Sequence, residues 1–170
     1  MRVSAKFRRH YGCKLVKHDP PVQSFPQTWN LDILSHGRSQ LLVLASEEHT
    51  LFSVLVPTSR TRNLERFMAE FRARFFELLE NIRIHSADRP DPSQVMFAGR
   101  IDRRIVGSQN DLLLTANCFL MEAEKPASTD TLRMIEERLN ETPLSYLGMA
   151  SPIEALRGSA AKLKVRDKID

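Results

Sequence analysis

The chain has few cysteines and no long apolar run. Its 170 residues include two cysteines, Cys13 and Cys118, which lack the paired spacing of a zinc site or a redox motif. We therefore expect two reduced thiols and no disulfide. No stretch approaches the roughly 18 apolar residues of a membrane span, and the charged N-terminus has no apolar segment of a secretory signal. These absences favour a cytoplasmic protein that does not enter the membrane.

Catalytic signatures are also missing. The five histidines show no close metal-ligand pairing, and the set His10, Cys13 and His18 fits no standard metal site. There is no glycine-rich phosphate loop with its lysine. Ser-His-Asp sets can be drawn from any chain of this length, so they carry no weight without geometry. We expect no metal and no cofactor, and we favour a non-catalytic protein over an enzyme.

What the chain does have is the composition of one globular domain, predicted over residues 1–170. Hydrophobic residues make up 42% and charged residues 27%. A chain of 170 residues can bury a hydrophobic core without disulfides or a structural metal. The net charge of +4 reflects two basic ends, residues 1–18 and 157–170. Basic ends attract nucleic acid or an acidic protein. The candidate nucleic-acid-binding residues are Lys6, Arg8, Arg9, Lys14, Lys162, Lys164 and Arg166.

Three short runs predict strands. Residues 29–34 alternate apolar and polar side chains, 40–46 are almost continuously apolar, and 51–57 are rich in β-forming residues and end at a proline. The short segments between them fit hairpin loops. Residues 94–99 predict a fourth strand at the sheet edge. We therefore expect an antiparallel sheet of three or four strands, with residues 40–46 in the middle.

The clearest helix is predicted over residues 62–84. Its apolar residues recur at steps of three and four and form one stripe, which is typical of a buried core. The opposite face carries charges of both signs, which does not suit a helix that reads nucleic acid. Further helices are predicted over residues 4–11, 128–140 and 151–163. Their expected N-caps are Ser4, Ser128 or Thr129, and Ser151. The expected fold is α+β, with the long amphipathic helix and the further helices packed on the sheet.

The stretch GSQND, residues 107–111, is the strongest candidate for a site. If Ser108 is an N-cap, Asp111 falls three residues later and can reach back to the cap amide. An apolar run follows directly. This spacing predicts a helix that starts at Ser108, with Asp111 serving the cap or a neighbouring arginine.

An anion site is the alternative reading of the same stretch. Helix N-termini favour anions, and Arg103 and Arg104 lie just upstream, but the charge of Asp111 opposes an anion. The cap leaves Arg103, Gln109 and Asn110 unexplained. These residues would either hold a loop through buried hydrogen bonds or line a pocket. The candidate ligand- or partner-binding residues are Arg103, Ser108, Asn110 and Asp111.

Three stretches resemble a family of small bacterial proteins with no assigned function. DRRIVGSQNDLLL is similar to that family's pattern Asn-Arg-Ser-x-Leu-Gly-Ser-Met-Asn-Asp, LFSVLVPTSRTRNLERFMAEF resembles its strand followed by a helix, and LNETPLSYLGMASPIEAL resembles its terminal segment. The resemblance implies a compact α+β domain in a bacterial cytoplasm, sometimes carried on mobile DNA. It supplies no reaction and no catalytic residue. The chain departs from the pattern at Asp102, Arg104 and Gln109, where the family has Asn, Ser and Met.

Two functions stay open. The preferred one is a non-catalytic binding or regulatory module, whose partner is a protein or a nucleic acid approached through the basic ends. The alternative is a small enzyme or ligand-binding protein with a polar pocket built from Arg103, Asn110 and Asp111, and from Glu141 or Tyr146 of the late loop. Converging polar groups at the helix start would favour the alternative. The oligomeric state stays open.

Overall fold

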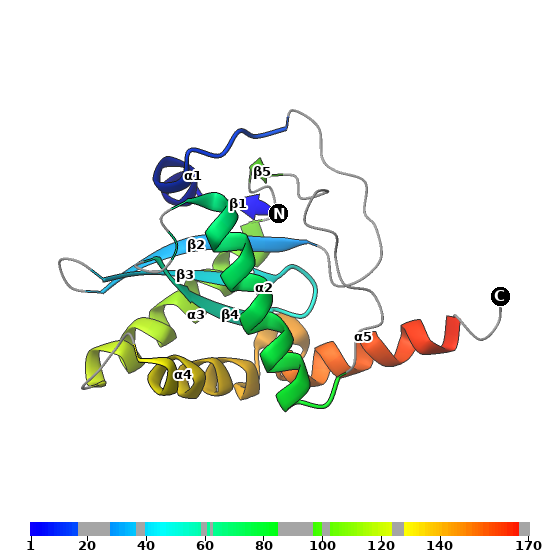
Figure 1. Ribbon diagram of the computed structural model, residues 1–170. Coiled ribbons are helices and arrows are strands. Elements are labelled where there is room, and N and C mark those ends of the chain that lie inside the picture. Colours follow the sequence, from blue (N-terminus) through cyan, green and yellow to red (C-terminus); the bar gives the residue numbers. More distant parts are fainter. Residues whose placement is uncertain are drawn as a thin grey trace.

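The protein forms one sheet with helices on both faces (Figure 1). The computed structural model describes residues 1–16, 28–36, 40–58, 61, 63–84, 97–99, 103–123 and 128–166, with the backbone alone at residues 36, 40 and 160–166. In chain order the elements are β1 (Arg2–Val3), α1 (Ala5–Tyr11), β2 (Trp29–His36), β3 (Gln40–Glu47), β4 (Ser53–Pro57), α2 (Leu64–Asn81), β5 (Ala98–Gly99), α3 (Arg103–Glu122), α4 (Thr129–Glu141), the 3-10 turn η3 (Ser145–Leu147) and α5 (Pro152–Arg166).

The sheet is mixed, with strand order β4-β3-β2-β1-β5 among the described residues. Strands β2, β3 and β4 form the expected antiparallel meander, with Trp29 opposite Glu47 and Leu42 opposite Pro57. Strand β1 adds parallel to β2, and β5 adds parallel to β1. The prediction of three or four antiparallel strands was therefore only partly right, because the described strands number five and β1 and β5 run parallel to their neighbours. Two-residue strands such as β1 are too short to show an alternating pattern in the sequence.

Alternate side chains of a strand point to opposite faces of the sheet. Each face is covered by its own helices, which form a separate core with it. Helices α1 and α2 cover one face, and α2 crosses in front of the strands in Figure 1. Here Trp29 of β2 lies edge-on to Phe71 and Phe75, at ring distances of 4.9 and 5.1 Å. Helices α3 and α4 cover the other face, where Leu112 and Leu132 belong to the second core. The predicted apolar stripe of α2 is confirmed.

Three helices begin at the predicted serine caps. Ser4, Ser128 and Ser151 each accept a hydrogen bond from the backbone amide three residues later. At α5 the carboxylate of Glu154 also accepts from the backbone amide of Ser151, and the two bonds form a capping box. The proline-containing stretch 19–28, apart from its last residue, and residues 85–93, for which the sequence indicates a connector and a loop, lie outside the described residues.

Helix α3 begins at Arg103, so the predicted start at Ser108 was wrong. The GSQND stretch lies inside the helix, and Ser108 does not cap it. The buried stripe of α3 already includes Ile105 and Gln109 and continues to Leu120, so packing favours the earlier start. Gly107 costs only about 1 kcal/mol inside a helix. No helix in the described ranges is both long and apolar enough to span a bilayer.

Candidate functional site

The candidate residues of α3 lie on its solvent-facing side. Arg103, Asn110 and Asp111 are exposed, and Ser108 is half-buried. None of them lines either of the two cavities described below. Among the described residues, these side chains lie on one helix surface and outside both cavities.

Gln109 is the residue of the GSQND stretch that reaches the interior. Its side chain is fully buried, and its amide nitrogen donates a 2.8 Å hydrogen bond to the backbone carbonyl of Asn30 on β2. This bond ties α3 to the sheet and explains a residue that the expected cap left unexplained. A sequence signal existed, because Gln109 lies four residues after Ile105 and three before Leu112 in the buried stripe.

The outward side of α3 carries large apolar side chains. Leu114 is 65% exposed and Met121 is 71% exposed, one heptad apart on the same side of the helix as Arg103. Single exposed apolar residues are common, and these two on one helix face make this side of α3 the candidate interaction surface. We call this surface the outward face of α3. It consists of Arg103, Gly107, Asn110, Asp111, Leu114, Cys118, Met121 and Glu122.

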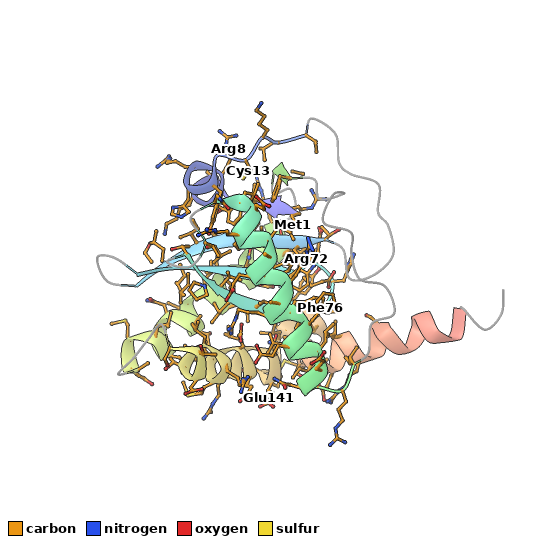
Figure 2. The ribbon with its side chains drawn as sticks, in the orientation of Figure 1. Met1, Arg8, Cys13, Arg72, Phe76 and Glu141 are labelled. Carbon is orange, nitrogen blue, oxygen red and sulfur yellow. The ribbon has the colours of Figure 1, made fainter. Side chains whose placement is uncertain are left out.

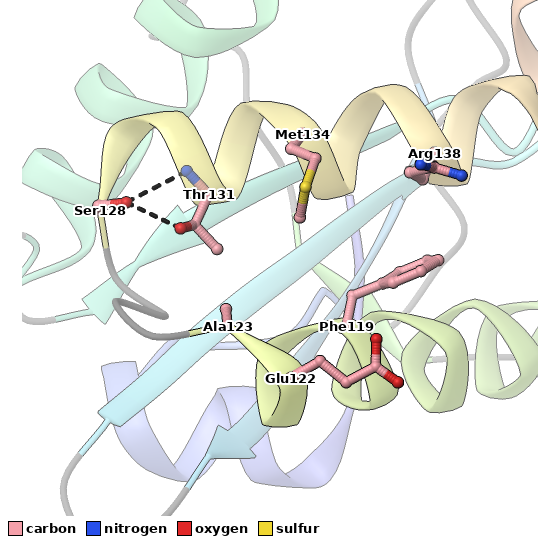
Figure 3. Close-up of a pocket in the computed structure, with 7 residues that line it drawn as sticks. All are labelled: Phe119, Glu122, Ala123, Ser128, Thr131, Met134 and Arg138. Carbon is pink, nitrogen blue, oxygen red and sulfur yellow. Dashed lines mark hydrogen bonds between the residues drawn. The ribbon is translucent and has the colours of Figure 1, made fainter.

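A groove of about 550 Å³ runs between α3 and α4 beside this face (Figure 3). Phe119 and Ala123 of α3 and Met134 of α4 supply its apolar lining, and Met134 is 42% exposed. Glu122 and Arg138 supply one charge of each sign. Such a lining accommodates an apolar side chain flanked by polar groups. We call it the α3–α4 groove.

A second cavity of about 430 Å³ lies among the ends of α2, α4 and α5. Glu141, expected to belong to a pocket with the α3 residues, lines this cavity instead, together with Glu137 and Glu154. Figure 2 places Glu141 at the end of the molecule opposite Arg8. The remaining lining residues are Phe52, Leu78, Asn81, Ile82, Asn140, Ser151, Ile153 and Arg157.

A buried ion pair joins α2 to α4 around the edge of the sheet. Arg74 Nη2 lies 2.5 Å from Glu136 Oε2, and both side chains are almost fully buried. Glu136 Oε1 also accepts a 2.7 Å hydrogen bond from the backbone amide of Leu55 on the edge strand β4. Burial raises the pKa of Glu136 to about 7, although the neighbouring Arg74 opposes this shift. Glu136 was not predicted from the sequence. Its place directly after Ile135 in the stripe of α4 was the signal that marks it as buried.

Asn140, one helical turn after Glu136, also bonds to the backbone of the edge strand β4. Its side-chain oxygen accepts from the backbone amide of Ser53 at 2.7 Å, and its nitrogen donates to the carbonyl of Ser53 at 2.8 Å. The amide thus occupies the place of a neighbouring strand. Unpaired edge strands are templates for aggregation, so Glu136 and Asn140 serve the fold.

Helices α1 and α5, which carry parts of the two basic ends, lie apart in the molecule. Lys6, Arg8, Arg9 and Lys14 are exposed on and after α1, and Lys6 Nζ donates to the carbonyl of Ile33 at 2.9 Å. Helix α5 lies at the other end of the molecule from α1 (Figure 1). It contains Lys162, Lys164 and Arg166, whose side chains lie outside the described residues. Within the described ranges, no three histidine, cysteine or carboxylate side chains gather as metal ligands do.

The geometry defines an α+β domain with a helix-covered mixed sheet and an exposed helical face beside a groove. Residues 1–155 match a family described as a domain of unknown function, DUF6933. The chain therefore belongs to this family. No curated protein matches the chain.

Proposed function

We propose that the protein is a non-catalytic binding module that docks another protein on the outward face of α3 and in the α3–α4 groove. The exposure of Leu114 and Met121 on one helix face carries this proposal. Burying such side chains against a partner is favourable, at roughly 25 cal/mol per Å² of apolar surface. Methionines such as Met121 and Met134 also adapt their shape to a partner.

The candidate binding residues fit the polar part of this surface. Arg103, Asn110 and Asp111 are exposed on the same face as Leu114, and Ser108 is half-buried beside them. Polar groups commonly surround the apolar centre of an interface. The alternative, a small enzyme or ligand-binding protein with a pocket at these residues, has less support, because neither described cavity includes them.

We propose a bacterial and cytoplasmic setting for this module, with a gene sometimes carried on mobile DNA. The support is the sequence resemblance described above and the two free cysteines, of which Cys118 is exposed. Exposed thiols persist in reducing compartments.

Nucleic acid is the second candidate partner, and the exposed Arg8, Arg9 and Lys14 favour it. Binding by these residues would weaken steeply as salt rises, because phosphate contacts release counterions. Filter binding of DNA and RNA at low and physiological salt tests this candidate. Absence of retention at low salt would exclude it, and unchanged retention by an Arg8→Glu/Arg9→Glu variant would exclude α1 as the site.

Site-specific photo-crosslinking in the protein's own host tests the proposed docking. A photoreactive amino acid replaces Leu114 on α3 or, as a matched control, the exposed Ala69 on α2. The proposal predicts a discrete protein adduct from position 114 and none from position 69. If neither Leu114 nor Met121 yields an adduct, the outward face does not dock a protein.

A further inference from the structure

We infer that the protein docked on the outward face of α3 is a second copy of this chain, whose own α3 packs antiparallel to the first. This inference rests on the proposed function, since it names the partner of the same surface. Its evidence is the placement of charge, glycine and apolar residues along α3.

The charges of α3 oppose its own helix dipole. Arg103 lies in the first turn and Glu122 in the last, and the helix has no acidic residue in its first turn and no basic residue in its last. A single helix is stabilised by the reverse arrangement. Neither Arg103 nor Glu122 pairs with another residue in the described part of the chain, and both are exposed. The arrangement suits a neighbouring helix that runs in the opposite direction.

An antiparallel copy places complementary groups opposite each other. With a twofold axis between Leu112 and Leu113, Arg103 lies opposite Glu122 of the second copy, and the same pair forms again by symmetry. Each arginine then lies at the partner helix's C-terminal end, where a positive charge is favourable. A parallel copy would place arginine against arginine.

The apolar and small residues of the outward face fit the same register. The two copies of Leu114 meet near the axis, and Gly107 lies opposite Cys118. No atom of the described residues lies within 4 Å of the place of a Cβ atom on Gly107, so the second helix can approach closely there. Met121 packs toward the aliphatic part of Arg103 from the other copy. The surface is therefore complementary to itself at its charged ends and at Gly107, whereas the two copies of Asp111, which also lie near the axis, oppose the pairing.

A charge swap tests the pairing by equilibrium sedimentation of the purified full chain. We expect a dimer whose affinity falls about tenfold in Arg103→Glu, since two ion pairs become repulsive. The double variant Arg103→Glu/Glu122→Arg restores the affinity. Arg9→Glu, the same charge change on α1, leaves it unchanged. A wild-type monomer at every concentration, or a double variant no better than the single one, overturns the inference.

A cysteine at position 107 tests the register. Gly107→Cys has space in the single chain, and its thiol lies roughly 16 Å along the same helix from Cys118, too far for an internal disulfide. Mild oxidation is expected to give a covalent dimer of Gly107→Cys and none of the wild type. If wild-type Cys118 links to its own copy, the register is wrong and the inference is overturned.

The photo-crosslink at Leu114 separates this inference from the proposed function. An adduct with the mass of two copies supports both. An adduct with a different protein supports the docking function and overturns self-pairing. A missing adduct contradicts the docking function itself.

Discussion

Glu136 and Arg74 meet in the interior although their helices cover opposite faces of the sheet, with Glu136 Oε2 and Arg74 Nη2 2.5 Å apart. They meet beyond the edge strand β4, whose Leu55 amide also donates to Glu136. One carboxylate therefore joins α2, α4 and the sheet. Removing one member of a buried pair usually destabilises a protein more than removing both.

The pH dependence of stability follows from the pKa of Glu136. Burial raises this pKa to about 7 from an ordinary value of 4.5, so the folded state binds the proton more tightly than the unfolded state. The stabilisation is fully present below about pH 4.5 and is lost as the pH rises through about 7. We expect the free energy of unfolding of the wild type to fall between about pH 5 and pH 8, relative to Glu136→Gln, which cannot ionise.

Urea denaturation of both proteins across this pH range measures the difference. Glu80→Gln is the control, because Glu80 is an exposed carboxylate on the same helix α2. If the wild type instead gains stability over Glu136→Gln as the pH rises, the attraction of Arg74 outweighs burial and the pKa of Glu136 is lowered.

Asn140 is expected to matter for solubility as well as stability. Asn140→Ala leaves the amide and carbonyl of Ser53 without their bonds, and we expect a loss on the order of 2 kcal/mol from two unsatisfied buried groups. The uncovered edge of β4 should also increase aggregation during refolding. Asn81→Ala, at an exposed position on α2, should do neither. Equal behaviour of the two variants would show that Asn140 does not shield the edge.

Gln109 is expected to tolerate a neutral replacement better than a charged one. Gln109→Glu places a buried carboxylate against the carbonyl of Asn30, and we expect a loss of at least about 3 kcal/mol. Gln109→Met loses at least the hydrogen bond to the carbonyl of Asn30, which is worth about 1 kcal/mol. Thermal and urea unfolding measure both. The exposed neighbour Asn110→Asp serves as the control, and an equal loss there would contradict the buried position of Gln109.

The two serines followed by an acidic residue three positions later should respond differently to alanine. Ser151 caps α5 through Glu154, so Ser151→Ala should cost about 1 kcal/mol. Ser108 lies inside α3, where alanine is the better helix former, so Ser108→Ala should cost nothing measurable. If Ser108→Ala lowered the stability and Ser151→Ala did not, Ser108 would be the N-cap of α3.

Sequence periodicity predicted the elements whose signal is local. The stripe of α2 and the meander β2–β4 follow from patterns within a few residues, and the structure confirms both. Capping patterns are weaker evidence, because a serine followed by an acidic residue three positions later marks the start of α5 yet lies inside α3. The burial of Ile105 and Gln109 indicates the earlier start of α3, and α5 begins with Pro152 directly after its serine.

The site was less accessible to sequence reasoning, because its contacts are distant in the chain. Arg74 and Glu136 are 62 residues apart, and Gln109 and Asn30 are 79 apart. Helical phase alone marks Glu136 and Gln109 as buried, but it does not identify their partners. The helical periodicity predicts which residues of α3 are exposed only when it is known that the helix begins at Arg103.

Hydroxyl-radical footprinting of the methionines tests the central claim most directly. Met121 on the outward face is 71% exposed, and Met149, outside this face, is 66% exposed, so the two oxidise at similar rates in the free protein. In the protein's own host extract and at high protein concentration, docking on α3 predicts strong protection of Met121 and none of Met149. Equal oxidation of Met121 and Met149 under every condition would contradict the claim that α3 presents a docking surface.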